Sequence, residues 1–244
     1  MASRGLKTMH DTVSGDARPS ALLTIVIPTL NEGSVIADLL ASLATFRLRG
    51  VEVVVVDGGS TDGTAEAAGP GADRVIVAPC GRARQMNAGA AAAHAPVLLF
   101  LHADTRLPAN ADQLILNGLG ATGLEWGRFD VRIEGASRWL RVVASFMNLR
   151  SRITGIATGD QARFVTRRAF DAVRGFPDQA LMEDVELSSC LKQRGPPLRV
   201  GSPVVTSGRR WRARGVARTI ILMWWIRLLY FMGVAPDRLA RLYH

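Results

Sequence analysis

TIVIPTLNE at residues 24–32 and VVVVDGGSTDGT at residues 53–64 each join an uninterrupted apolar run to a polar loop. Apolar runs of this kind are typical of strands that helices cover on both faces, as in a parallel sheet. Ligands of such sheets bind just past the carboxyl ends of the strands, where Glu32, Asp57 and Asp62 are expected. Acids in that position serve hydroxyl groups, N–H groups or a hard metal ion. Those three needs together describe a sugar nucleotide that carries a divalent cation.

Strand-like and helix-like stretches alternate through the first half of the chain. Strands are predicted at residues 51–56, 74–77 and 97–101, and helices at residues 34–46, 82–93 and 109–119. This alternation predicts βαβ crossovers and an α/β fold with a mainly parallel sheet flanked by helices. From residue 126 the pattern differs, because residues 126–133 alternate polar and apolar side chains before a helix-like stretch at 137–151. A second half built differently is a natural place for an acceptor site.

The composition favours one large α/β domain. The chain has 244 residues, of which 48% are hydrophobic and 21% charged, enough to bury a full core. We expect a flexible arm at residues 1–20, the catalytic domain at 21–205 and a basic, apolar helical segment at 206–244. The net charge of +9 comes mostly from arginine, which is either a compositional bias or an attraction to phosphates or an anionic membrane. No zinc-finger, RNP-type or basic-zipper pattern indicates nucleic acid.

Cysteine usage and the first residues indicate a cytoplasmic protein. Cys80 and Cys190 stand alone, without the spacing of a disulfide framework or a zinc site. The first twenty residues lack the apolar core of a signal peptide. We therefore expect the protein in the cytoplasm, with a peripheral position at the inner face of the cell membrane as a further expectation.

A third apolar run, at residues 98–101, ends in His102 and Asp104. Alternate residues of an extended segment share a face, so both side chains can point into one space. A carboxylate suits Mg²⁺ or Mn²⁺ bound mainly by diphosphate oxygens, and histidine is tolerated better by Mn²⁺. The alternative is that His102 caps a loop and Asp104 caps the following helix.

Five short motifs follow one another in an order that resembles family 2 glycosyltransferases. They are PTLNE at residues 28–32, DGGSTDGT at 57–64, HAD at 102–104, GDQARF at 159–164 and MEDVELS at 182–188. The radical-SAM/selenodomain-associated transferases are the most similar subgroup, since they also show GRARQMNAG, here at 81–89, and an RRW near the C-terminus. The resemblance covers nearly the whole chain from residue 23. It implies a GT-A (Rossmann-like) fold with a mixed, mainly parallel sheet and a helical C-terminal extension. It also implies a nucleotide-sugar donor such as a UDP-sugar, a divalent cation (Mn²⁺ or Mg²⁺), and inversion at the anomeric carbon.

The resemblance also implies roles for individual residues on the donor side. Thr29 and Glu32 line the nucleoside pocket, Asp57 accepts an N–H of the base, and Arg82 and Arg84 contact the base or the diphosphate. Asp104 holds the metal, and His102 stands where the family has the first acid of its DXD element. Glu32 and Asp57 each have a competing structural role, as an acid at a helix N-terminus and as a turn former respectively.

On the acceptor side, the family pattern favours Asp184 as the catalytic base, with Glu183 supporting it. Inverting transfer needs one carboxylate close to the acceptor hydroxyl. The alternative is that both acids are first-turn residues of the helix predicted at 185–194, favoured there by the helix dipole. Asp160 is a candidate for holding donor or acceptor hydroxyls.

The last forty residues are basic and apolar together. Arg209, Arg210 and Trp211 resemble the arginine–tryptophan element that covers the donor diphosphate in related enzymes. Residues 219–226 and 228–234 are almost wholly apolar, but Arg227 interrupts them, so a membrane span is not predicted. Two interpretations stay open, namely a helix packed on the catalytic core and a helix lying in the membrane interface.

The acceptor is not readable from the sequence, and lipids, small metabolites and polysaccharide ends all stay possible for it. Two other functions also compete with a glycosyltransferase. A sugar-1-phosphate nucleotidyltransferase would need a glycine-rich loop with a lysine near the N-terminus, and Lys7 precedes the first strand. A noncatalytic, membrane-associated protein that binds sugar nucleotides would tolerate loss of Asp184. A serine hydrolase is disfavoured because Asp62 stands where the nucleophile elbow needs its second glycine.

Overall fold

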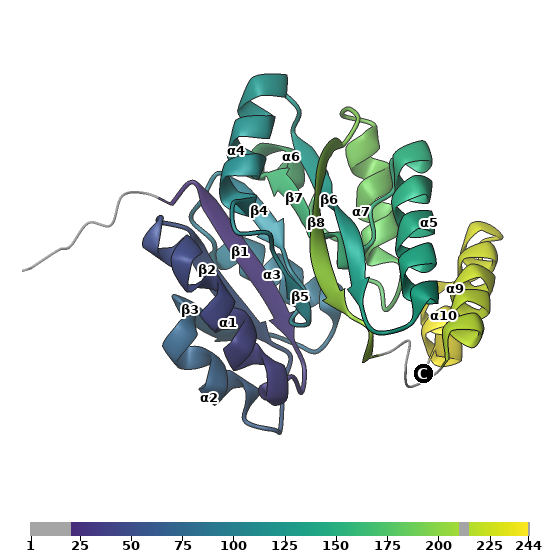
Figure 1. Cartoon of the computed structure of the whole chain (residues 1–244), viewed down its shortest axis with the longest axis horizontal. Coiled ribbons are helices and arrows are strands. Elements are labelled where there is room, and N and C mark those ends of the chain that lie inside the picture. Colours follow the sequence, from purple (N-terminus) through teal and green to yellow (C-terminus); the bar gives the residue numbers. More distant parts are fainter. Residues whose placement is uncertain (1–20, 210–214, 244) are drawn as a thin grey trace, which may run out of the picture.

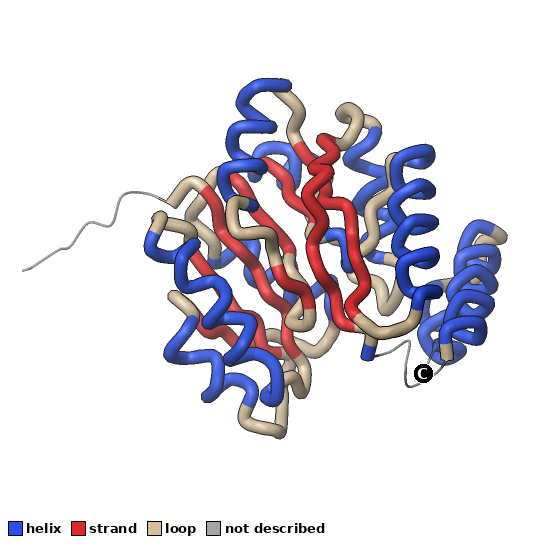
Figure 2. The backbone as a smooth tube through the Cα atoms, viewed as in Figure 1, coloured by secondary structure: helices blue, strands red, loops and turns tan. Residues whose placement is uncertain are grey.

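An eight-stranded mixed sheet forms the centre of the molecule, with helices on both faces (Figures 1 and 2). The computed structural model describes residues 21–209 and 215–243. The strand order is β3-β2-β1-β4-β7-β6-β8-β5. The strands are β1 (Leu23–Thr29), β2 (Glu52–Asp57), β3 (Arg74–Val77), β4 (Val97–Phe100), β5 (Thr105–Arg106), β6 (Trp126–Glu134), β7 (Arg163–Thr166) and β8 (Leu198–Ser207). This confirms the predicted α/β fold.

The first four strands are all parallel, and their register sets the place of the polar loops. β1 pairs with β2 so that Thr29 lies opposite Asp57, and it pairs with β4 on its other side. Every residue of β1 is buried, as its uninterrupted apolar run predicts. The loops after β1, β2 and β4 therefore leave the sheet at one edge.

Alternate residues of these strands build two separate hydrophobic layers. Ile25 and Ile27 face α1 (Gly33–Leu48) and α4 (Ala111–Thr122), whereas Val26 and Leu98 face α3 (Arg82–Ala92), α6 (Arg167–Ala172) and α7 (Glu183–Lys192). Short helices at α2 (Thr64–Ala68), η1 (Gly69–Gly71) and η2 (Gly159–Gln161) complete the connections.

Helix α3 lies unusually close to the sheet at Gly89. A Cβ atom at this position would lie 2.3 Å from Cγ1 of Val26 and 2.9 Å from Cγ2 of Val56. Only glycine permits that separation, because any side chain would overlap the strand side chains. The contact fixes the helix over β1 and β2 and so fixes the position of its first turn.

The second half contains the antiparallel pairings that make the sheet mixed, as the resemblance implied. β7 runs antiparallel to both β4 and β6, and β8 pairs with β6 in parallel and with the two-residue β5 antiparallel. The polar residues Arg128 and Asp130 of β6 are buried, although their alternation suggested exposure, because the two side chains form an ion pair. Helix α5 (Arg138–Thr154) packs on β6, where Asn148 bonds both backbone groups of Val131.

Several predicted boundaries shift by a few residues. The helix expected at 185–194 is α7, which begins at Glu183, so all three acids of the MEDVELS motif lie in its first turn. Strand β8 runs through the expected domain boundary at residue 205, and the division into segments stays a prediction. The arm at residues 1–20 lies outside the described residues.

The C-terminal segment is helical, as predicted, and its two helices lie together at one edge beside α5 (Figure 1). They are α9 (Val216–Phe231) and α10 (Pro236–Tyr243). Ile220 of α9 packs against the small cluster formed by Ile133, Leu140 and neighbouring residues, and Tyr230 donates a hydrogen bond of 2.8 Å to Glu186 of α7. In the part of the chain that the structure describes, no helix is long and apolar enough to cross a membrane.

Candidate functional site

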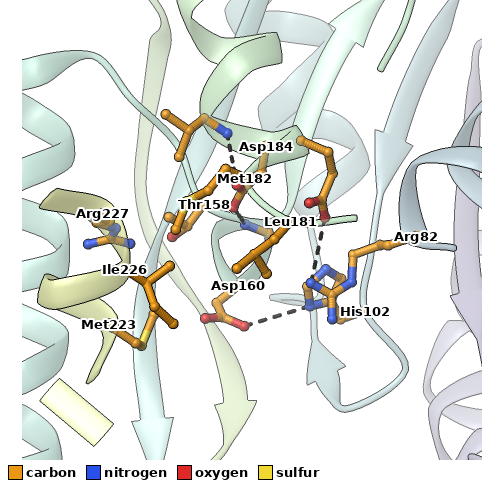
Figure 3. Close-up of a pocket in the computed structure, with 13 residues that line it drawn as sticks. Arg82, His102, Thr158, Asp160, Leu181, Met182, Asp184, Met223, Ile226 and Arg227 are labelled. Atoms are coloured by element: carbon orange, nitrogen blue, oxygen red, sulfur yellow. Dashed lines mark hydrogen bonds and ion pairs between the residues drawn. The ribbon is translucent and has the colours of Figure 1, made fainter. Parts of the chain in front are cut away.

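A cleft opens at the carboxyl ends of β1 and β4, and a second pocket continues from it towards α7 and α9 (Figure 3). The two share Arg82, His102, Asp160 and Glu183. Thr29, Glu32 and Asp104 line the first, whereas Asp184 and Arg227 line the second. The fold thus gathers residues from the PTLNE, HAD, GDQARF and MEDVELS motifs around one connected space.

Asp57 lies at the end of β2, and its side chain points into the loop that follows the strand. Its carboxylate accepts hydrogen bonds from the backbone N–H groups of Gly59 at 3.0 Å and Ser60 at 2.8 Å, and from the hydroxyls of Ser60 and Thr29. Burial works against the charged form, but the hydrogen bonds from Ser60 and Gly59 outweigh it and lower the pKa of Asp57. Because these donors already occupy the carboxylate, Asp57 shapes the loop. Its predicted contact to a base N–H stays a prediction.

Gln85 holds the ends of β1 and β2 together from the first turn of α3. Its Nε2 donates to the carbonyl oxygens of Thr29 at 2.7 Å and Val56 at 2.9 Å. The sequence analysis did not single out this buried residue, since a polar residue within a helix gives no local sign of a contact to two strands. Gln85 lines the cleft beside Thr29.

An ion pair joins the N-terminal and C-terminal parts of the site. Nη2 of Arg209 lies 3.0 Å from Oε2 of Glu32 and 3.9 Å from Oδ2 of Asp104. One cation therefore faces two of the predicted donor-side acids. Arg210 and Trp211 lie outside the described residues. Arg84 points away to the exposed surface, where it pairs with Asp178 at 2.8 Å and does not line the cleft.

His102, Asp160, Arg82 and Glu183 form two pairs across the pocket (Figure 3). Nδ1 of His102 lies 3.6 Å from Oδ1 of Asp160, and Nη1 of Arg82 lies 3.6 Å from Oε1 of Glu183. Burial raises the pKa of the Glu183 carboxyl, and the adjacent Asp184 carboxylate raises it further, against the opposing effect of Arg82.

Asp184 is fixed by two backbone donors at the start of α7. Its Oδ2 accepts from the N–H of Gly159 at 2.9 Å and its Oδ1 from the N–H of Val185 at 2.8 Å. Behind it, the fully buried Arg163 of β7 donates to the carbonyl oxygens of Asp184 and Ala157 and to the hydroxyl of Ser188. Arg163 is a second residue that sequence analysis missed, because its role depends on the antiparallel strand β7.

The predicted metal ligands differ in how well they suit a divalent cation. Asp104 has a carboxylate that is 30% exposed at the cleft, and carboxylate oxygens are ligands that Mg²⁺ and Mn²⁺ prefer. His102 is less suited to bind a metal ion. Its Nε2 is buried against Gly159, so closely that a Cβ atom at Gly159 would lie 2.5 Å from it, and its Nδ1 faces Asp160. Within residues 21–209 and 215–243, no group of three or more His, Cys, Asp or Glu side chains is arranged to hold a metal ion.

A family model described as Glycosyl transferase family 2 matches residues 24–175. The chain belongs to glycosyl transferase family 2. The matched segment contains β1, β2 and β4 together with Thr29, Glu32 and Asp104 of the cleft, so the motif-based resemblance to this family is confirmed, whereas the subgroup stays a prediction. No curated protein sequence matches the chain significantly.

Solved structures share the fold at low sequence identity. S. aureus TarS in complex with UDP-GlcNAc is 18% identical with a TM-score of 0.63, covering 77% of this chain and 58% of that one. The mannosyltransferase PcManGT from Pyrobaculum calidifontis, in complex with GDP-Man and Mn²⁺, is 22% identical with a TM-score of 0.58, covering 91% and 67%. Glucosyl-3-phosphoglycerate synthase from Mycobacterium tuberculosis, in complex with Mn²⁺, UDP and glucosyl-3-phosphoglycerate, is 17% identical with a TM-score of 0.59, covering 83% and 78%. This chain therefore spans less than two thirds of the TarS chain.

The buried Glu183 carboxyl predicts a pH-dependent effect on stability. Because its folded-state pKa is raised, the stability that it contributes is complete below the ordinary range of glutamate and is lost as pH rises through the folded pKa. We expect Glu183→Gln to raise the melting temperature at about pH 8 and to change it little at about pH 4, where both side chains are neutral. Thermal unfolding across this range measures the difference, with the exposed Glu66→Gln as control. A gap that widens on acidification would contradict this prediction.

Proposed function

We propose that this protein transfers a sugar from a nucleoside-diphosphate sugar, probed first as UDP-sugars, to a hydroxyl or carboxyl group of an acceptor with inversion at the anomeric carbon. The observation that carries the proposal is the position of Glu32 and Asp104 on one side of a connected cleft and of Asp184 on the other. This arrangement separates acids suited to a donor from an acid suited to an acceptor.

The donor side supplies a polar floor and a cationic rim. Thr29 and Glu32 would line the nucleoside pocket, and Gln85 fixes the strand ends beneath it. Arg82 and Arg209 would contact the diphosphate, since both guanidinium groups reach the cleft as partners of acids. Asp160 would hold sugar hydroxyls between the two sides. From the resemblance alone, we also assign a contact with the diphosphate to Arg210 and Trp211.

Asp184 would act as the base. The acceptor oxygen forms a bond to the anomeric carbon while the bond to the diphosphate oxygen breaks on the opposite face, and the diphosphate leaves with the electron pair. The acceptor proton passes to the Asp184 carboxylate. Each oxygen of that carboxylate accepts one backbone N–H and keeps a further lone pair for an acceptor hydroxyl. Glu183, buried beside it, would position the turn.

A divalent cation would be held by Asp104, with diphosphate oxygens and water as the other ligands. When bound, such an ion neutralises the charge that develops on the leaving diphosphate. Arg209 already provides positive charge between Glu32 and Asp104, so protein and ion would share this task.

We expect Mn²⁺ to tighten UDP binding through Asp104. Without a cation, the diphosphate would face the Glu32 and Asp104 carboxylates with much of its charge uncompensated. Calorimetric titration of UDP with and without Mn²⁺ measures the effect, and Asp104→Ala should abolish it. Asp38→Ala, an exposed acid on α1, is the matched control. Equal affinity with and without Mn²⁺ in the unmutated protein would refute the metal proposal.

Asp184→Asn should reduce turnover by roughly 10²–10⁴-fold while donor affinity stays nearly constant, because asparagine keeps the shape but cannot take the proton. Release of free nucleotide from UDP-sugars measures turnover, and Asp38→Asn serves as control. Turnover near the unmutated rate would remove Asp184 from the mechanism. A folded protein that binds sugar nucleotides and turns over none would favour the noncatalytic alternative, and formation of a sugar nucleotide from a sugar 1-phosphate would favour the nucleotidyltransferase.

We also propose that the protein is cytoplasmic and docks reversibly on an anionic membrane. Exposed apolar residues of α5 recur at alternating intervals of three and four, which places them on one side of the helix. The exposed apolar residues are Trp139, Val142, Phe146, Leu149 and Ile153 on α5 and Ile221, Trp224, Trp225, Leu228 and Phe231 on α9, each at least 42% exposed. Helix α5 carries no acid, and its arginines Arg138 and Arg141 are exposed, whereas Arg152 pairs with Asp130 and Arg150 is largely shielded from solvent. A second copy of the chain would bring these like charges together, whereas anionic headgroups would complement them.

Flotation with liposomes tests this docking. We expect binding to anionic vesicles at low salt, weaker binding at high salt and none to neutral vesicles, because each basic residue near the surface adds about 1 kcal/mol that salt screens. Phe146→Ser on α5 should weaken binding, whereas Leu48→Ser, which changes a still more exposed apolar residue on α1, should not. A protein that ignores anionic vesicles at low salt would refute the proposal.

A further inference from the structure

Behind the proposed base lies a small cavity that holds two arginines. Arg150 of α5 and Arg227 of α9 line it together with Met182, Val185 and Phe231. Arg227 also lines the pocket that contains Asp160 and Asp184 (Figure 3). The cavity therefore adjoins the pocket of Asp184, because Met182, Val185 and Arg227 line both.

These arginines lack the partners that buried arginines of this fold otherwise have. Nε and Nη2 of Arg150 and Nε of Arg227 are shielded from solvent and have no hydrogen-bond partner in the part of the chain that the structure describes. Nε of Arg163 and Nε of Arg128 are likewise without a partner, but Nη2 of Arg163 donates to three oxygens and Nη1 of Arg128 pairs with Asp130. No such contact is made by Arg150 or Arg227 within the described residues. A buried donor without an acceptor costs free energy, so the two unpaired groups need an explanation.

Both guanidinium groups stay charged at neutral pH and repel each other. Burial, followed by the nearby Arg227 cation, lowers the pKa of Arg150 to about 10. Burial likewise lowers the pKa of Arg227, and the carboxylates of Asp184 and Asp160 oppose this shift. Two neighbouring cations inside an otherwise largely apolar cavity form a place where an anion would be stabilised.

We propose that Arg150 and Arg227 bind an anionic group of the acceptor, so that the acceptor is a phosphate- or carboxylate-bearing compound. Guanidinium groups match both anions through paired N–H donors. An anion in this cavity would hold a hydroxyl of the same molecule towards Asp184, which lies in the adjoining pocket. The inference rests on the proposed function, because it assumes that Asp184 faces the acceptor.

The same chemistry is found in a free metabolite and in a lipid headgroup, and two pairs of probes separate them. Glycerol 3-phosphate is compared with glycerol, and dihexanoyl phosphatidic acid with dihexanoylglycerol. Binding is titrated calorimetrically with the protein already saturated with UDP and Mg²⁺, which fills the donor side. We expect any anionic probe that binds to have an affinity at least about tenfold higher than that of its neutral twin. Tighter binding of phosphatidic acid than of glycerol 3-phosphate would identify the lipid source.

Arg150→Gln and Arg227→Gln should each weaken anion binding by about tenfold or more and leave UDP affinity within about twofold. Arg141→Gln on α5 and Arg218→Gln on α9 remove exposed arginines from the same helices and should change neither. Arg150→Lys, which keeps the charge without the planar fork, should retain part of the binding. In the ligand-free protein, Arg150→Gln should not lower the melting temperature, because it removes an unpaired buried charge.

The outcomes separate this inference from the proposed function. Unchanged anion binding in the folded Arg150→Gln and Arg227→Gln variants would overturn the inference, as would an unmutated protein that prefers no anionic probe to its neutral twin. A lowered melting temperature in Arg150→Gln with unaltered anion binding would assign Arg150 a structural role beside Asp184. Anion binding that needs both arginines in a protein without affinity for UDP would instead refute the proposed donor while leaving the subsite in place.

Discussion

A strand that is buried on both faces carries mostly apolar side chains, so polar residues that line a cleft gather at or beyond its end, and this constraint shapes the whole molecule. β1 has no exposed residue, and its neighbours β2 and β4 are almost as fully covered. The parallel register that sets Thr29 opposite Asp57 makes these strands end together. The polar residues that follow them therefore gather at one edge, where the cleft lies. Asp57 and Gln85 then satisfy the loop N–H groups and the strand carbonyls that would otherwise stay unpaired.

A buried guanidinium group organises the proposed acceptor side. Arg163 lies on β7 and bonds the backbone of both Ala157 and Asp184, so one side chain connects the loop before η2 with the start of α7. The N–H of Gly159 closes the arrangement by donating to the Asp184 carboxylate. A carboxylate held in this way loses little conformational entropy when a substrate arrives, which favours a precise reaction geometry.

Much of the donor side could be predicted from local sequence, and most of the acceptor side could not. Apolar runs ending in acids give β1, β2 and β4 and the positions of Glu32 and Asp104, because each signal lies within about ten residues. The ion pair of Glu32 with Arg209 joins residues 177 positions apart and has no local sign. Arg227 was visible as an interruption of an apolar stretch, yet its contact with the pocket of Asp184 depends on how α9 packs. Strand β7 was missed because its four residues carry no distinct period.

The geometry of this site depends on Gly89, a residue that lies away from the cleft. Helix α3, which carries Arg82 and Gln85, packs directly on Val26 and Val56 because Gly89 has no Cβ atom. Gly89 lies about two helical turns from the cleft. Even alanine at this position would push the axis of α3 away from the sheet and carry both of those residues with it. Mutational tolerance in this protein therefore does not follow distance from the cleft, since a small, apolar and buried position is among the least replaceable.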